Sequence, residues 1–292
     1  MTRDNPYSRS AGVAERVVRE HGITALKVDP IAIAEKLGIE VMAKPASSGG
    51  VSGMLIRVGN QFGIAYATHI DSTGFRRFSI AHELGHYFLP GHVDSVFADG
   101  NIHESHAGFN STDRYEMEAD HFAARLLMPN ALFSEALRHA GDGLAAVERL
   151  SATCETSLTA TAIRYAQCSH DPVAIIVSTS TRIDYCFMSK SLAEVKGLEW
   201  IRKGQPLPVG GPTHALNGQP DRVRRADRNV GTSDLQDWFG GPFSVEITED
   251  VVGLGRYGKS LTVLHGIELP DEDEPDQDDD SLIESWTPRF RR

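Results

Sequence analysis

The chain has 292 residues, a length that suits one sizeable domain and a smaller one. Its residues are 40% hydrophobic and 24% charged, which are the proportions of a soluble globular protein. Its formal net charge of -11 excludes a broad nucleic-acid-binding surface, because such a surface needs a basic face. It contains no run of eighteen apolar residues, so no membrane span is expected, and the polar segment Met1 to Ser10 lacks the pattern of a signal peptide.

The first elements are two helices and three strands. Apolar residues recur at helical spacing over residues 10–21 and 29–38, and Asp29-Pro30 supplies an N-cap followed by proline at the first helical position. Gly59-Asn60 is a favourable hairpin turn between two strand-like segments. The predicted strands are Glu40–Ala43, Val51–Val58 and Gln61–Ala67.

Two longer helices follow. The first runs from about Phe75 to Leu89 and ends at Pro90-Gly91. Residues 91–111, rich in Gly, His, Ser and Asn, predict a loop that covers whatever the first helix presents. The second runs from about Thr112 to Leu127 and ends before Pro129.

Residues 130–168 are predicted to be helical and have the length of a helix-turn-helix. The second half of this segment lacks positive charge, which favours a packing element over a DNA reader. Direct DNA binding is therefore not expected.

The pattern changes to strands after Pro172, which predicts a second α+β domain. A Gly- and Pro-rich stretch occupies residues 204–220, and the basic stretch Arg222–Arg228 predicts a solvated loop. The predicted strands are Val173–Ser178, Arg182–Met188, Phe243–Ile247, Val251–Leu254 and Ser260–Leu264.

The fold class predicted is α+β, in three parts. Residues 1–170 form the larger domain, with a small sheet, two long helices and the helical segment 130–168. Residues 171–269 form a smaller α+β domain with a sensory or regulatory role. Residues 270–292 form an acidic, disordered tail, since Asp271 to Asp280 carries eight acids in ten residues.

The three cysteines, Cys154, Cys168 and Cys186, lie far apart and lack CxxC spacing. They predict reduced thiols rather than a disulfide framework or a cysteine zinc site, and a cytoplasmic protein.

The chemistry is concentrated in His82-Glu83-Leu84-Gly85-His86, within the first long helix. Positions four apart share one helix face, so the imidazoles of His82 and His86 can bind one ion, and zinc suits such ligands. Glu83 is placed beside the open coordination position, where it can act as the general base.

The second long helix offers a third ligand. Glu116 and Asp120 stand four residues apart on one face, so one carboxylate can bind the metal while the other accepts the N–H of a ligand histidine. Glu118 points elsewhere on this helix and is interpreted as a solvated charge.

These two segments resemble the ImmA/IrrE family of metallopeptidases. The resemblance rests on Arg76-Arg-Phe-Ser-Ile-Ala-His-Glu-Leu-Gly-His86 and on Glu116-Met-Glu-Ala-Asp-His-Phe-Ala-Ala-Arg-Leu-Leu-Met-Pro129. It covers residues 10–170 and implies a zincin-like fold for the domain of residues 1–170. It also implies a gluzincin-like site, with His82, His86 and Glu116 as zinc ligands and Glu83 as the catalytic residue. Asp120 fills the Asp/Asn position of the family motif, and its role as a partner of a ligand histidine is inferred from the spacing.

His92 is a rival third ligand. It lies six residues after His86, the spacing of the third histidine in metzincins, but Leu89 stands where those enzymes have glycine. Glu116 is therefore preferred. The group that stabilises the oxyanion stays open among several side chains: His103, His106, His121, Tyr66 and Tyr115.

The function predicted is that of a cytoplasmic zinc-dependent endopeptidase, with one Zn²⁺, or another divalent metal such as Mn²⁺, per chain. The resemblance implies a specific intracellular protein substrate, typically a helix-turn-helix transcriptional repressor in stress response or mobile-element control. Gln61–Ala67 is either an edge strand that pairs with substrate or an interior strand. The alternative function is a regulatory protein that binds a ligand or partner and has a structural or weakly active metal site.

Overall fold

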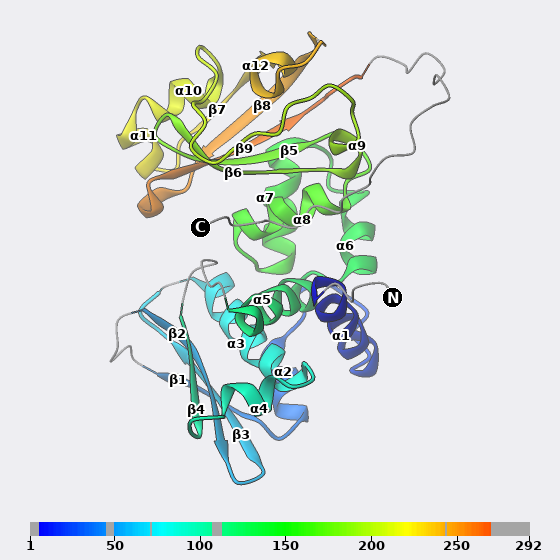
Figure 1. Cartoon of the computed structure of the whole chain (residues 1–292), viewed down its shortest axis with the longest axis vertical. Coiled ribbons are helices and arrows are strands. Elements are labelled where there is room, and N and C mark those ends of the chain that lie inside the picture. Colours follow the sequence, from blue (N-terminus) through cyan, green and yellow to red (C-terminus); the bar gives the residue numbers. More distant parts are fainter. Residues whose placement is uncertain (1–5, 45–49, 71, 107–112, 243, 270–292) are drawn as a thin grey trace.

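The computed structural model describes residues 6–44, 50–70, 72–106, 113–242 and 244–269. Twelve α-helices and two β-sheets are found among these residues, so the predicted α+β class is confirmed. One sheet and the long N-terminal helices lie at one end of the molecule, the second sheet lies at the other, and a group of helices lies between them (Figure 1).

The first sheet has the strand order β1-β3-β2-β4. Its strands are β1 (Glu40–Lys44), β2 (Val51–Val58), β3 (Gln61–Ala67) and β4 (Ile102–His106). The hairpin between β2 and β3 is confirmed, with Gly59 in the left-handed region at φ 61°. Since β3 pairs with both β1 and β2, it is an interior strand, and the edges of this sheet are β1 and β4.

The prediction of a loop over residues 91–111 was wrong in part. This segment forms a short helix, α4 (His92–Val96), and the strand β4, which pairs antiparallel with β2. The sequence of β4, Ile-His-Glu-Ser-His, has one apolar residue and gives no strand pattern of its own. Its extended form comes from pairing with β2, which is distant in the sequence.

The N-terminal helices begin where the sequence places capping residues. They are α1 (Pro6–Glu20), α2 (Pro30–Lys36), α3 (Thr73–Phe88) and α5 (Arg114–Leu127). Asp29 accepts from the backbone N–H groups of Ile31 and Ala32, as predicted. Ser72 caps α3 and Asp113 caps α5 in the same way, and α5 packs between α1 and α3.

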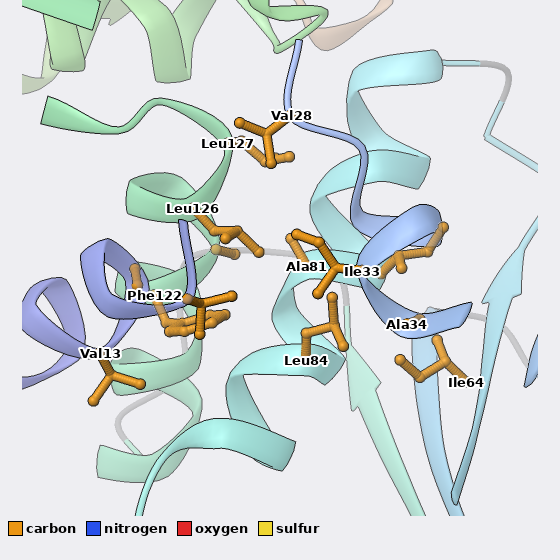
Figure 2. Close-up of a cluster of buried hydrophobic side chains, with 14 of the residues drawn as sticks. Val13, Val28, Ile33, Ala34, Ile64, Ala81, Leu84, Phe122, Leu126 and Leu127 are labelled. Carbon is orange, nitrogen blue, oxygen red and sulfur yellow. The ribbon is translucent and has the colours of Figure 1, made fainter. Parts of the chain in front are cut away.

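One hydrophobic core joins these helices to the first sheet. Ala81 and Leu84 of α3 lie between Ile64 of β3 and Phe122 of α5, and all four are buried (Figure 2). Each fully buried leucine, isoleucine or phenylalanine side chain stabilises the fold by about 1.5–3 kcal/mol. The core therefore fixes the position of α3 relative to α5.

Gly85 sets how closely α3 approaches α5. A Cβ atom at this position would meet Cα of Ala119 at 3.1 Å and a ring carbon of Phe122 at 3.1 Å. The backbones of α3 and α5 are therefore in contact where the two helices cross. Any larger side chain at Gly85 would increase the distance between the helices.

Replacing Gly85 with valine is expected to destabilise the metal-free protein by about 1–3 kcal/mol, because the added carbons overpack the crossing. Chemical denaturation in the presence of a chelator measures this change. Gly12→Val is the control, since a Cβ atom at this helical glycine meets nothing within 4 Å, and its stability should stay within about 0.5 kcal/mol of wild type. Equal stability of both variants would contradict close packing at Gly85.

The segment that follows is helical, as predicted. It consists of α6 (Asn130–Leu137), α7 (Gly143–Cys154) and α8 (Leu158–Cys168), which lie between the two sheets in Figure 1. Their buried residues share a core with strands of the second sheet. This placement agrees with the interpretation of residues 130–168 as a packing element.

The second sheet is antiparallel throughout, with the order β6-β5-β9-β8-β7. Its strands are β5 (Ala174–Thr179), β6 (Arg182–Met188), β7 (Arg228–Asp234), β8 (Glu246–Gly253) and β9 (Lys259–His265). Four short helices accompany it: α9 (Lys190–Ala193), α10 (Pro212–Asn217), α11 (Pro220–Arg224) and α12 (Leu235–Phe239).

The interpretation of Arg222–Arg228 as a solvated loop was wrong in part, since Arg224, Arg225, Ala226 and Arg228 are exposed but the ends of the stretch lie in regular elements. These residues end α11 and begin β7, a strand that the sequence did not predict. Arg222 pairs with Asp227, and Arg228 pairs with Glu148 of α7. Val230 is the one large apolar residue of β7, so the sequence of this strand shows no alternation of apolar and polar residues. Its extended conformation comes from pairing with β8.

Cys154, Cys168 and Cys186 are free thiols, of which Cys154 is buried. No helix in the part of the chain that the structure describes is both long enough and apolar enough to span a membrane. The acidic tail, residues 270–292, lies outside the described residues.

Candidate metal centre

The two histidines of the His-Glu-Leu-Gly-His segment point to the same place from α3. The Nε2 atoms of His82 and His86 are 3.1 Å apart, and both side chains are almost fully buried. This distance follows from the helix itself, because residues four apart lie one above the other on one face.

Glu116 of α5 completes a triangle with these two histidines. Its Oε2 atom lies 3.3 Å from Nε2 of His82, and its Oε1 atom lies 3.3 Å from Nε2 of His86. Ligand atoms about 2.0–2.2 Å from a tetrahedral zinc ion are about 3.3–3.5 Å apart. The three side chains therefore fit such an ion in spacing and in donor type.

The charges of this group favour a cation. Burial disfavours a charge on His82, but hydrogen bonds to Asp120 and Glu116 outweigh it and raise the pKa of His82 to about 10. Burial likewise opposes the charge of Glu116, but the hydrogen bond from His103 and the neighbouring imidazoles of His82 and His86 lower the pKa of this carboxyl far below its usual range. The carboxylates of Asp120 and Glu116 thus stabilise a positive charge on the ring of His82. They would stabilise a metal ion bound at the same place in the same way.

Asp120 lies one turn after Glu116 and contacts the far side of His82. Nδ1 of His82 donates to Oδ1 of Asp120 at 2.8 Å. Because Nδ1 keeps this proton, Nε2 is the nitrogen that gives up its proton to a metal and then offers a lone pair on the side of Glu116 and His86. The spacing argument from the sequence anticipated this contact.

Glu83 is buried beside the triangle. It is 0% exposed, and neither carboxylate oxygen has a partner among the described residues. Gly53 of β2 leaves the room for it, since a Cβ atom there would lie 2.5 Å from Oε1 of Glu83. Burial raises the pKa of Glu83 to about 7, against the opposing charge of His82.

His103 of β4 is brought to the same place. Its Nε2 atom donates to Oε1 of Glu116 at 3.0 Å, and its ring centroid is 4.6 Å from that of His86. His103 also forms a second group of possible metal ligands with Glu83 and His86. The sequence named His103 among several side chains, but could not distinguish it because β4 was not predicted.

His92 does not enter the triangle. The chain does turn back after α3, at Pro90-Gly91, and His92 is fully buried. Its Nδ1 atom lies 3.2 Å from Nδ1 of His86, on the opposite side of that ring from Glu116. The geometry therefore favours Glu116 over His92 as the third ligand.

The interpretation of Glu118 as a solvated charge was wrong. Glu118 is 2% exposed, and its Oε2 atom accepts from Nε2 of His92 at 3.1 Å. Arg114, one turn earlier on α5, donates to the other oxygen of Glu118. The side chain of Glu118 does point away from Glu116, as expected, but it points to His92 of α4 rather than to solvent.

The other candidate side chains lie apart from the triangle. His121 contacts Tyr7 of α1, its ring centroid 5.1 Å away, and burial lowers the pKa of His121 to about 4. Tyr115 packs edge-on against His92 with a centroid distance of 4.9 Å. His106 is an exposed residue at the end of β4, and Tyr66 packs against the hydrophobic core.

Comparison with solved structures shows a likeness of fold. No curated protein matches the chain. A solved structure described as a Mycobacterium tuberculosis transcriptional regulator is similar, with a TM-score of 0.54, 16% sequence identity, and coverage of 88% of this chain and 76% of that chain. At this identity the likeness concerns the fold alone, and it extends beyond the N-terminal sheet.

The family model Peptidase_M78, described as the IrrE N-terminal-like domain, matches residues 34–165. This range contains His82, His86, Glu116 and every other side chain of the candidate metal centre. The resemblance to the ImmA/IrrE family of metallopeptidases is thereby confirmed over residues 34–165.

Proposed function

We propose that the chain is a zinc-dependent endopeptidase in which His82, His86 and Glu116 hold the metal and Glu83 is the catalytic residue. The observation that carries the proposal is the triangle of two Nε2 atoms and one carboxylate, with separations of 3.1–3.3 Å. Zinc is preferred over Mn²⁺ because two imidazoles and one carboxylate at tetrahedral spacing are ligands typical of catalytic zinc. The zincin-like arrangement of sheet, α3 and α5 is part of this proposal.

The bound metal supplies Lewis-acid chemistry, polarising the peptide carbonyl and lowering the pKa of water. Glu83 takes the proton from the attacking water and passes it to the leaving amine. The pocket suits this role, because Glu83 is buried, has no hydrogen-bond partner among the described residues, and has a pKa raised towards neutrality. His103 is placed to donate to the developing oxyanion, since its Nε2–H already points to the ligand carboxylate of Glu116.

We propose that the substrate pairs with β4 in an extended form. This strand is at the edge of the sheet and brings His103 to the metal centre. The unpaired side of an edge strand binds an extended peptide through main-chain hydrogen bonds. Gln61–Ala67, the earlier candidate for this role, is interior.

The proposed substrate is one specific protein of the cytoplasm, with a helix-turn-helix transcriptional repressor of stress response or mobile-element control as the first candidate. The family membership supports this choice. The solved structure of similar fold is described as a transcriptional regulator, which supports a role in the control of transcription.

A second candidate function is favoured by that same likeness, which covers 88% of this chain. On this reading the chain is a regulatory protein, its second sheet binds a ligand or partner, and the metal is structural. The two candidates differ in one respect, because only the first requires a protein to be cut.

The test compares the proteomes of cells that express the wild type or Glu83→Gln, with chemical labelling of new protein N-termini. The proposed function predicts one or a few cleavage sites that depend on the wild type. Identical sets of termini in both strains, with equal amounts of each variant, would favour the regulatory protein instead.

A further inference from the structure

We infer that His92 and Glu118 are positioning residues that fix the orientation and tautomer of His86 for metal binding. Nδ1 of His86 faces Nδ1 of His92 at 3.2 Å, and Nε2 of His92 faces Oε2 of Glu118 at 3.1 Å. The proposal rests on the proposed metal centre, but not on the cleavage of any peptide.

Metal binding through Nε2 of His86 requires one arrangement of the protons in this chain of contacts, with the His92 ring neutral. A buried carboxylate can only accept, so Nε2 of His92 carries a proton and donates it to Glu118. Nδ1 of the neutral His92 ring is then an acceptor, and Nδ1 of His86 must be its donor. The lone pair of His86 is thereby placed on Nε2, which lies 3.3 Å from Glu116.

The fold holds this pair firmly. His92 is 0% exposed and Glu118 is 2% exposed, and a buried polar side chain costs free energy unless it is hydrogen-bonded. Gly91, in the left-handed region at φ 83°, turns the chain after α3, and the N–H of His92 donates to the carbonyl of Leu89. Tyr115 covers the His92 ring edge-on.

Arg114 completes the arrangement at the surface. Its Nε atom donates to Oε1 of Glu118, while its side chain is 66% exposed. Glu118 is thus kept ionised inside the protein by one cation that reaches solvent. The two ligand histidines are supported differently, since Asp120 contacts His82 directly and Glu118 acts on His86 through His92.

Two measurements test the inference, and neither needs a substrate. The first is the tautomer of His86 in the metal-free protein, read from ¹⁵N chemical shifts of the imidazole ring. The second is zinc affinity, measured by competition with a chromophoric chelator. In the wild type, His86 should be protonated at Nδ1.

His92→Leu removes the acceptor while retaining much of the buried volume. It is expected to shift His86 towards the other tautomer and to weaken zinc binding by about 10–100-fold, the usual effect of losing such a partner. His92→Asn, whose carbonyl oxygen is an acceptor near the place of Nδ1, should recover part of this affinity. Glu118→Gln should weaken binding in the same direction by a smaller factor.

His121→Leu is the matched control, since His121 is a histidine on α5 whose ring packs against Tyr7 of α1 and, among the described residues, lies apart from the metal-binding triangle. Its zinc affinity should equal that of the wild type. If His92→Leu lowers only the thermal stability and leaves both the His86 tautomer and the zinc affinity unchanged, the pair is structural and the inference is wrong. A wild type that binds no zinc would refute the proposed function, whereas the tautomer measurement would still decide the role of His92.

Discussion

Replacing Glu83 with glutamine is expected to reduce peptide cleavage by about 10²–10⁴-fold, because a general base contributes a factor of this size. Glutamine has nearly the same shape, so it fits the space that Gly53 leaves, but its amide cannot take a proton from water. Glu83 is not a member of the ligand triangle, and the variant should therefore bind zinc as the wild type does. Cleavage is measured on a peptide library or on the protein identified in cells, and zinc by elemental analysis.

Glu135→Gln is a control for this experiment, since Glu135 is an exposed residue of α6 whose partner is Arg138. Its activity should be unchanged. Full activity of Glu83→Gln would remove Glu83 from the proposed mechanism. Loss of zinc from Glu83→Gln would place it among the ligands instead, as in the second group with His86 and His103.

Replacing Glu116 with alanine is expected to weaken zinc binding by more than about 100-fold, beyond the range for residues that only support a ligand. Removing this carboxylate leaves two histidines, of which His82 is held by Asp120 and His86 by His92. Two ligands do not complete a catalytic zinc site. The affinity is measured with the same chelator competition as for His92→Leu.

Thermal unfolding gives an independent measurement on Glu116→Ala. A ligand that binds only the folded state stabilises it by about 2.7 kcal/mol at a concentration 100 times its Kd. Adding zinc should therefore raise the Tm of the wild type and leave that of Glu116→Ala unchanged. If Glu116→Ala keeps its zinc while His92→Ala loses it, the metzincin-like arrangement with His92 as third ligand is the right one.

The sequence predicted those parts of the site that depend on local geometry. The pairs His82 with His86 and Glu116 with Asp120 follow from the spacing of four residues on a helix. The bounds of β2 and β3 follow from apolar patterning and one hairpin turn, and the structure confirms them.

The parts that were missed depend on contacts with other segments of the chain. The strands β4 and β7 have no apolar alternation, and each is held extended by a neighbour that lies elsewhere in the sequence. Without β4, nothing placed His103 beside Glu116. Glu118 was misjudged because the position of α4, which brings His92 to it, depends on the turn at Gly91.

The position of β4 at the edge of its sheet sets a conformational demand on the substrate, if the substrate pairs with this strand as proposed. A partner that pairs along the five residues of β4 must offer a stretch of similar length in extended form. The same residues cannot be helical at that moment, so the proposal implies that a stable helix near the cleavage site would protect a protein from cleavage. Selection would then depend on how often a target opens locally, and a target could be marked for cutting by destabilisation rather than by its sequence.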